Sequence, residues 1–157
     1  MRGEYDQAQS YYQQSETLLR EMGDKGELAR LVHNLGYITL HQGDLDGAEL
    51  QFRESLAMFI KLNNQRGIAE CLSAIAGLWV ENGEIQTGAQ LLGAATNLLD
   101  QTGGSWWPAD RVEIERIHNL LKNEMDRDDH EASLGAGQTI TVEGAVSMVM
   151  DEFSIGS

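Results

Sequence analysis

Residues 43–56 read GDLDGAELQFRESL, and the pair that opens this stretch recurs, as a glycine followed by an acidic residue, at an interval of 40. The three pairs are Gly3-Glu4, Gly43-Asp44 and Gly83-Glu84. Other positions share the interval: Ala8, Ala48 and Gly88; Tyr12, Phe52 and Leu92; Ser15, Ser55 and Ala95. A fixed period of this length indicates a stack of similar units, each of which buries its apolar face against its neighbours. The sequence therefore predicts a repeat protein whose function lies on its surface.

The spacing of apolar residues between the glycines predicts helices. The steps are three and four residues, as on one face of an α-helix, and in residues 45–62 they give the set Leu45, Ala48, Phe52, Leu56, Phe59 and Leu62. Gly23, Gly43, Gly83 and Gly103 stand where helices would end, since glycine is the usual C-cap residue. Gly36 and Gly88 lie inside predicted helices, where their small size favours close approach of two backbones. We predict an all-α chain.

The composition limits the classes of partner. Across 157 residues, 11 basic and 25 acidic side chains give a formal net charge of −14. This charge argues against direct binding of nucleic acid, which needs a cationic face, and against an anionic membrane surface. No apolar run approaches the length of a membrane span. The single cysteine, Cys71, excludes an internal disulfide and fits a core position in a cytoplasmic protein.

These positions resemble the tetratricopeptide repeat, a helix-turn-helix unit. The matching residues are Asn34-Leu35-Gly36, Gly43-Asp44, Ala48, Phe52 and Ser55-Leu56. The resemblance implies a right-handed superhelix of antiparallel helix pairs over residues 1–103. The first copy lacks its first helix, so residues 4–22 supply the second helix alone. We expect the apolar edge of Tyr5, Tyr12 and Leu19 to be covered by a second copy in a homodimer or by a preceding domain.

Residues 104–157 depart from the repeat pattern and are predicted to be capping helices and a tail of the same domain. Pro108 suits the first position of a helix, because its missing N–H has no partner there in any case. Thr141 is predicted to be the N-cap of a last helix. Residues 123–131 are rich in carboxylates but match no calcium loop, so we interpret them as a solvated connection and expect no metal site.

The tail extends the resemblance to large bacterial regulators. The stretches concerned are residues 88–95, 107–110 and 137–145. They resemble the end of the repeat region in LuxR-type and related antibiotic-regulatory proteins, which join an ATPase module to tetratricopeptide repeats. The sequence contains no glycine-rich phosphate-binding loop and no recognisable DNA-binding segment after Glu152. ATPase activity and DNA binding are therefore not implied for this chain.

The first helix of each tetratricopeptide pair lines a concave groove, and helical spacing places a set of polar residues on that face. We predict that none of them is needed for the apolar core and that they bind a protein or peptide: Arg30, His33, Asn34, Tyr37, His41, Glu70, Ser73 and Glu81. Trp106 is a possible anchor for the partner at the end of the groove.

The sequence contains no catalytic motif, so we predict no enzymatic activity, no catalytic residue and no cofactor. The expected function is that of a protein-binding scaffold or sensor, within a bacterial signalling or transcriptional regulator. Two alternatives stay open. One is a regulatory domain that binds a small-molecule effector in a closed pocket, and the other is a homodimerising structural module.

Overall fold

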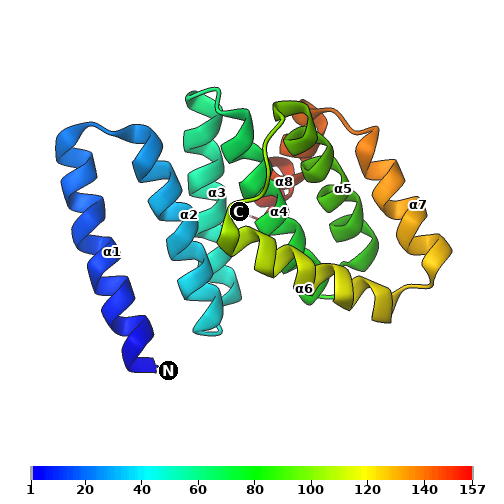
Figure 1. Ribbon diagram of the computed structural model, residues 1–157, viewed down its shortest axis with the longest axis horizontal. Coiled ribbons are helices and arrows are strands. Elements are labelled where there is room, and N and C mark those ends of the chain that lie inside the picture. The colour runs from blue at the N-terminus through cyan, green and yellow to red at the C-terminus, as the bar shows by residue number, and fades with distance from the viewer. Residues whose placement is uncertain (1, 157) are drawn as a thin grey trace. The chain divides into compact units, whose positions relative to one another are not determined.

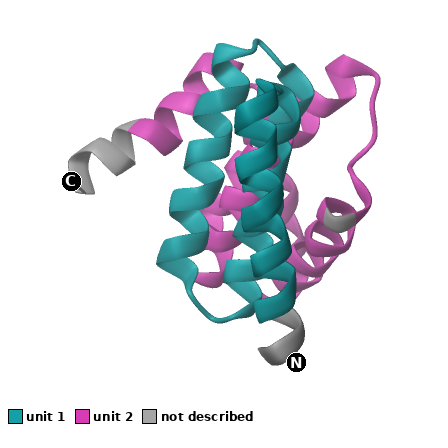
Figure 2. Cartoon of the chain, turned by 90° about the vertical axis from the view of Figure 1, so that its left-hand side faces the viewer, with its two compact units in different colours: residues 1–67 teal, residues 68–157 magenta. Residues whose placement is uncertain are grey.

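The computed structural model describes the backbone of residues 2–156 and the side-chain surroundings of residues 6–108 and 110–150. Within residues 2–156 the chain forms eight α-helices and no strand (Figure 1). The all-α prediction is confirmed, and the helices are consistent with a tetratricopeptide-like repeat fold. The chain forms two compact units, Met1–Gly67 and Ile68–Ser157 (Figure 2). The superhelical path of the whole chain and the limit between repeats and tail at residue 103 stay predictions.

The first unit contains α1 (Arg2–Met22), α2 (Lys25–His41) and α3 (Leu45–Lys61). The helix α2 packs against both α1 and α3, and short turns make successive helices antiparallel (Figure 1). The core of the α2–α3 pair is formed by the apolar side chains predicted to face inward, with Ala48, Phe52 and Leu56 completely buried. Leu45 and Leu62, at the two ends of the predicted set, are 38% and 39% exposed.

A left-handed backbone conformation ends one helix after another. Positive φ angles occur at Gly23, Gly43, Asn63, Gly83 and Gly103, a spacing of 20 residues. After four of these helices the same pair of backbone hydrogen bonds closes the turn, as where Gly43 N–H donates to Leu40 and Asp44 N–H to Thr39. The interval of 40 seen in the sequence is therefore two turns. The turn between Gly43 and Gly83 does not show in the glycine pattern, because Asn63 occupies it. Asparagine is one of the few residues besides glycine that adopt positive φ readily.

The acidic residue that follows Gly23, Gly43 and Gly83 is the N-cap of the next helix. Asp24 Oδ1 accepts a hydrogen bond from Glu27 N–H at 3.1 Å, and Asp44 Oδ1 accepts one from Gly47 N–H at 2.9 Å. Such N-caps satisfy a backbone donor that the helix itself leaves unpaired. The pair that defines the repeat therefore combines the end of one helix with the start of the next.

The second unit contains most of α4 (Gln65–Glu81), then α5 (Ile85–Thr102), α6 (Pro108–Glu124), α7 (Arg127–Gln138) and α8 (Val142–Gly156). The helix α5 is central, because α6, α7 and α8 all pack against it. Its buried face is almost entirely small and aliphatic. The predicted helix starts are confirmed: Pro108 is the first residue of α6, and Thr141 Oγ1 accepts from Gly144 N–H at 3.0 Å.

The solvated connection predicted over residues 123–131 is limited to residues 125 and 126, because α6 ends at Glu124 and α7 starts at Arg127. Asp126 caps α7, accepting from Asp129 N–H at 2.8 Å, and the helix starts at Arg127. The acidic residues that suggested a loop occupy the first turn of this helix, where the helix dipole favours negative charge. His130 and Ser133, further along α7, are buried.

Glycines allow α5 and α7 to approach to backbone contact. A methyl group placed on Gly137 would collide with the carbonyl oxygen of Gln90, and one placed on Gly93 with that of Leu134. The predicted role of the small residues is confirmed at Gly36, whose absent side chain makes room for the ring of Phe52. The same holds at Gly88, against Val80. Close contact of this kind depends on glycine, because its neighbours are backbone or a large ring.

Replacing Gly137 by alanine should therefore destabilise the packing of α7 on α5. Alanine has the higher helix propensity, but the collision with the backbone of α5 outweighs that gain. We expect the free energy of unfolding to fall by about 1–3 kcal/mol. The matched control is Gly135→Ala on the same helix, since a methyl group at Gly135 meets nothing within 4 Å. That control should be neutral or stabilise the protein by up to about 1 kcal/mol. Urea unfolding measures both, and equal effects of the two variants would contradict the proposed contact.

Candidate binding site

The predicted groove residues fall into two groups. Tyr37 and Ser73 are 7% and 3% exposed, and His33 and Glu70 are completely buried. The prediction that none of these side chains belongs to the core is wrong for these four. A helical pattern distinguishes the faces of one helix, but it does not show which polar face a neighbouring helix will cover.

His33 and Tyr37 form an aromatic cluster with Phe52. The ring centroids lie 5.2 Å apart for His33 and Tyr37, 5.3 Å for His33 and Phe52, and 5.0 Å for Tyr37 and Phe52. Two of the three pairs are edge-on, the geometry that aromatic rings favour. Nearby, Ser55 Oγ donates a hydrogen bond of 2.6 Å to the carbonyl oxygen of Ala29. These side chains hold α2 against α3, which leaves them no face for a partner.

Glu70 holds the start of α6. Its Oε1 accepts a hydrogen bond from the backbone N–H of Trp107 at 3.0 Å, across 37 residues of sequence. Glu81, the last residue of α4, forms an ion pair with Arg116 of α6. Both carboxylates of α4 that were predicted to bind a basic partner are therefore engaged within the second unit.

The other predicted residues remain accessible. Arg30 and His41 are exposed, and Asn34 and Trp106 are half-buried. Their role in partner binding stays a prediction. The prediction for Glu81 also stays open, since its side chain retains 22% exposure beside Arg116.

The apolar edge of α1 differs from the predicted one. Tyr5 lies outside the residues whose side chains the structure describes, and Tyr12 and Leu19 are half-buried. The exposed apolar side chains of this helix are instead Tyr11, Leu18 and Met22, at 67%, 59% and 75%. The spacing of seven and four residues places these three on one face of the helix.

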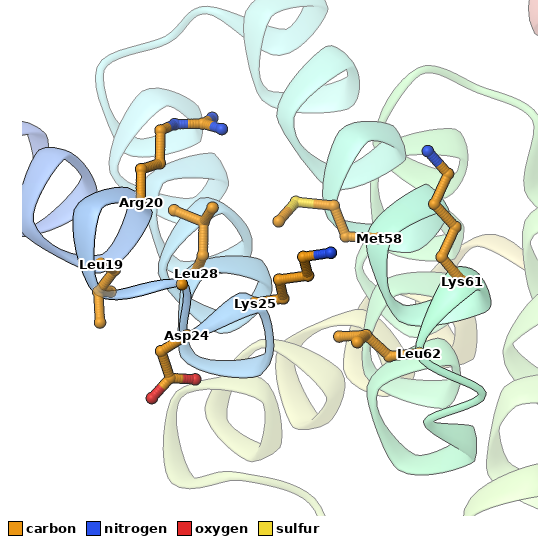
Figure 3. A pocket seen from close by; sticks show the side chains of 9 residues that line it. Leu19, Arg20, Asp24, Lys25, Leu28, Met58, Lys61 and Leu62 are labelled. Carbon is orange, nitrogen blue, oxygen red and sulfur yellow. The ribbon is translucent and has the colours of Figure 1, made fainter.

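A cavity of about 430 Å³ opens in the first unit where α1 and α3 end and α2 begins. We call it the α1–α3 cavity. Figure 3 shows its lining: Leu19, Arg20, Gly23, Asp24, Lys25, Leu28, Met58, Lys61 and Leu62. Met58 and Leu62 extend from the end of α3 toward Lys25 on α2 (Figure 3). Leu19, Leu28, Met58 and Leu62 supply an apolar surface, around which three basic side chains are placed.

The basic residues of the cavity differ in their partners. Arg20 is bound to Glu16 at 2.8 Å and lies 3.8 Å from Glu54, and these carboxylates raise its pKa. Lys25 and Lys61 form no ion pair with any residue that the structure describes. The sequence contains three lysines, so two of them line this one cavity. Their position next to the turns at Gly23 and Asn63 was the signal in the sequence that could have revealed the site.

A second cavity, of about 400 Å³, lies in the second unit between α5 and α7. Its lining is mostly polar and includes Gln86, Gln90 and Asp129. The neighbouring carboxylate of Asp126 raises the pKa of Asp129. Among the described residues that line it there is no basic side chain, in contrast to the α1–α3 cavity.

Two histidines meet where α6 packs on α7. The ring centroids of His118 and His130 are 6.1 Å apart. Burial lowers the pKa of His118 below its ordinary value of 6.5, and the nearby His130 and Lys122 lower it further. At neutral pH the His118 ring is therefore uncharged, as expected for a packing contact between helices.

The described residues contain no group of three or more histidine, cysteine, aspartate or glutamate side chains placed to hold a metal ion. Among the same residues, no helix is both long enough and apolar enough to cross a membrane.

Residues 1–61 match the family model of the tetratricopeptide repeat. The match covers α1, α2 and α3 and supports a tetratricopeptide-type domain in this part of the chain. Such domains are in general scaffolds for protein interaction without catalysis of their own. Neither the curated proteins nor the solved structures compared with the chain gave a match.

Glu70→Ala should destabilise the second unit, because it leaves the N–H of Trp107 without its acceptor. We expect the free energy of unfolding to fall by about 1–3 kcal/mol, which is typical when a buried hydrogen-bonding group loses its partner. Glu70→Gln keeps a carbonyl oxygen at this position and should cost less. Urea unfolding followed by tryptophan fluorescence measures both, with the exposed Glu115→Ala as control. If Glu70→Ala behaved like Glu115→Ala, the residue would be a surface group after all.

Proposed function

We propose that this chain is a non-catalytic module that binds a protein partner through a peptide segment. The observation that carries the proposal is the tetratricopeptide match over α1–α3, in a unit whose helix ends surround an open, partly apolar cavity. An apolar surface with a few polar groups at its edge is the usual composition of a ligand-binding cavity of this volume.

The peptide reaches the chain at the ends of helices rather than along the face formed by the first helix of each pair. This differs from the sequence-based hypothesis because His33 and Tyr37 are taken up by the core. Arg30 and His41 are exposed further along α2, and we propose that they add contacts to the peptide there. The proposed module uses no cofactor and binds no nucleic acid directly, in keeping with its charge of −14.

We place this module in the cytoplasm, as part of a bacterial signalling or transcriptional regulator. The support is the resemblance of residues 88–95, 107–110 and 137–145 to the end of the repeat region in such proteins. The single buried thiol of Cys71 is compatible with a reducing compartment. In that setting the partner would be a protein whose capture changes the state of the regulator.

An unbiased peptide-display selection on the full chain tests the proposal. We expect enriched peptides that bind with dissociation constants in the micromolar range, which corresponds to a binding free energy of about −8 kcal/mol or weaker. Amide chemical shifts of the labelled protein should change mainly at the ends of α1 and α3 and the start of α2. The selection is repeated on protein unfolded in urea as a control for non-specific capture. Failure to enrich any peptide that binds the folded protein would refute the proposed function.

A second candidate function, self-association, is favoured by the exposed apolar face of α1. Tyr11, Leu18 and Met22 form a row of exposed apolar side chains on this face, and apolar residues at this helical spacing are typical of the seam between two packed helices. The proposed occupant is α1 of a second copy, since a twofold interface brings identical surfaces together.

If α1 forms this interface, Leu18→Gln with Met22→Gln should shift the protein toward the monomer. Sedimentation velocity at several concentrations measures the change. The matched control is Leu50→Gln, because Leu50 on α3 is also exposed, at 55%, and lies outside the row. A wild-type protein that is monomeric at every concentration, or an equal effect of the control, would exclude self-association through α1.

A further inference from the structure

The α1–α3 cavity combines an apolar floor with a local excess of positive charge. Arg20, Lys25 and Lys61 border it, against a single acidic lining residue, Asp24. Asp24 is already engaged as the N-cap of α2, through Glu27 N–H at 3.1 Å. This combination is unusual in a chain whose acidic side chains outnumber the basic ones by 25 to 11. An apolar surface edged by Lys25 and Lys61, neither of which forms an ion pair with a described residue, matches a ligand that is apolar and anionic at once.

The distribution of charge along the sequence permits such a ligand to approach the first unit. Residues 1–67 contain seven of the 11 basic and ten of the 25 acidic side chains, so their net charge is −3. Residues 68–157 carry the remaining −11. The first unit is therefore nearly balanced, and a cluster of cations on it can set the local potential at distances shorter than the screening length, about 8–10 Å at moderate salt.

Helix stability does not explain the position of Lys25. It is the first residue of α2, where the positive end of the helix dipole makes a cation unfavourable. Lys61, at the last residue of α3, is placed favourably for the dipole, but its ammonium group forms no ion pair with a described residue. A carboxylate bound at Lys25 would be stabilised by its ammonium group and by the dipole of α2, and a second carboxylate would pair with Lys61 at the end of α3.

We propose that the α1–α3 cavity binds an acidic peptide segment of a partner protein. An aliphatic or aromatic side chain of the peptide occupies the apolar surface of Leu28, Met58 and Leu62. Flanking aspartate or glutamate carboxylates pair with Lys25 and Lys61, while Arg20 remains bound to Glu16. This inference rests on the proposed function and names the class of its partner.

Three fluorescein-labelled synthetic peptides test the inference on the full chain. The first peptide alternates glutamate with leucine and phenylalanine. The second has glutamine in place of every glutamate, and the third has lysine in place of every glutamate. Fluorescence anisotropy at low and high salt measures their affinities. We expect the acidic peptide to bind about tenfold or more tightly than the glutamine peptide at low salt, and to lose that advantage at high salt. Equal affinity of these two peptides would overturn the proposal.

The variant Lys25→Gln with Lys61→Gln locates the site. It should weaken the acidic peptide about tenfold or more and leave the glutamine peptide unchanged. The control, Lys122→Gln with Arg127→Gln, removes the same charge from the second unit and should change the affinity less than about twofold, as expected of exposed charges away from an interface. Met58→Gln should weaken both peptides without altering their salt dependence. Equal weakening by the two charge variants would show a general effect of net charge and refute the site.

Other occupants give different results. If inorganic phosphate displaces the acidic peptide at equal concentrations, the cavity is a simple anion site and the inference fails. It also fails if the wild-type chain self-associates and the lysine variant does not, because the occupant is then a second copy. Peptides from the unbiased selection that bind elsewhere would keep the proposed peptide-binding function, but they would refute both its location at the helix ends and this inference.

Discussion

The left-handed residue at the end of each helix is the constraint on which the rest of the structure depends. Positive φ at every twentieth residue from Gly23 to Gly103 fixes where α1 to α5 end, and α2, α3 and α4 consequently have the same length of 17 residues. Equal lengths and turns bring the same positions of successive helices to the same height. The residues that line the α1–α3 cavity meet for this reason, because the ends of α1 and α3 and the start of α2 lie at one end of the first unit.

The sequence predicts most of the helices and the glycines at which four of them end. Apolar spacing and turn glycines indicate these elements because each is a local property of a few neighbouring residues. The glycine-acid pairs indicate a repeat interval of 40 residues although the turns recur every 20, because Asn63 stands in place of glycine at one turn. The start of α7 was missed because acidic residues are typical both of solvated loops and of the first turn of a helix.

The candidate site was harder to predict, since it depends on contacts between helices. His33 and Glu70 are polar and stand on a polar face in the helical pattern, yet both are completely buried. His33 packs against the rings of Tyr37 and Phe52, and Glu70 accepts the N–H of Trp107. The partner of Glu70 stands 37 residues away in the sequence, beyond the range of a helical pattern, which relates only residues on the same helix. The lysines that border the cavity were overlooked because a lysine next to a turn is usually an ordinary solvated residue.

The hydrogen bond between Glu70 and Trp107 also has a consequence for the order in which the chain folds. Within the α2–α3 pair, the hydrogen bond of Ser55 to Ala29 joins residues 26 positions apart. The start of α6 depends on a partner 37 residues earlier, and Asn97 on α5 binds the carbonyl of Gln138 across 41 residues. Closing a longer loop costs more chain entropy, and local contacts form faster. During synthesis the α2–α3 pair can therefore complete its own core first, while α6 and α7 must wait for α4 and α5 to provide the surface on which they settle.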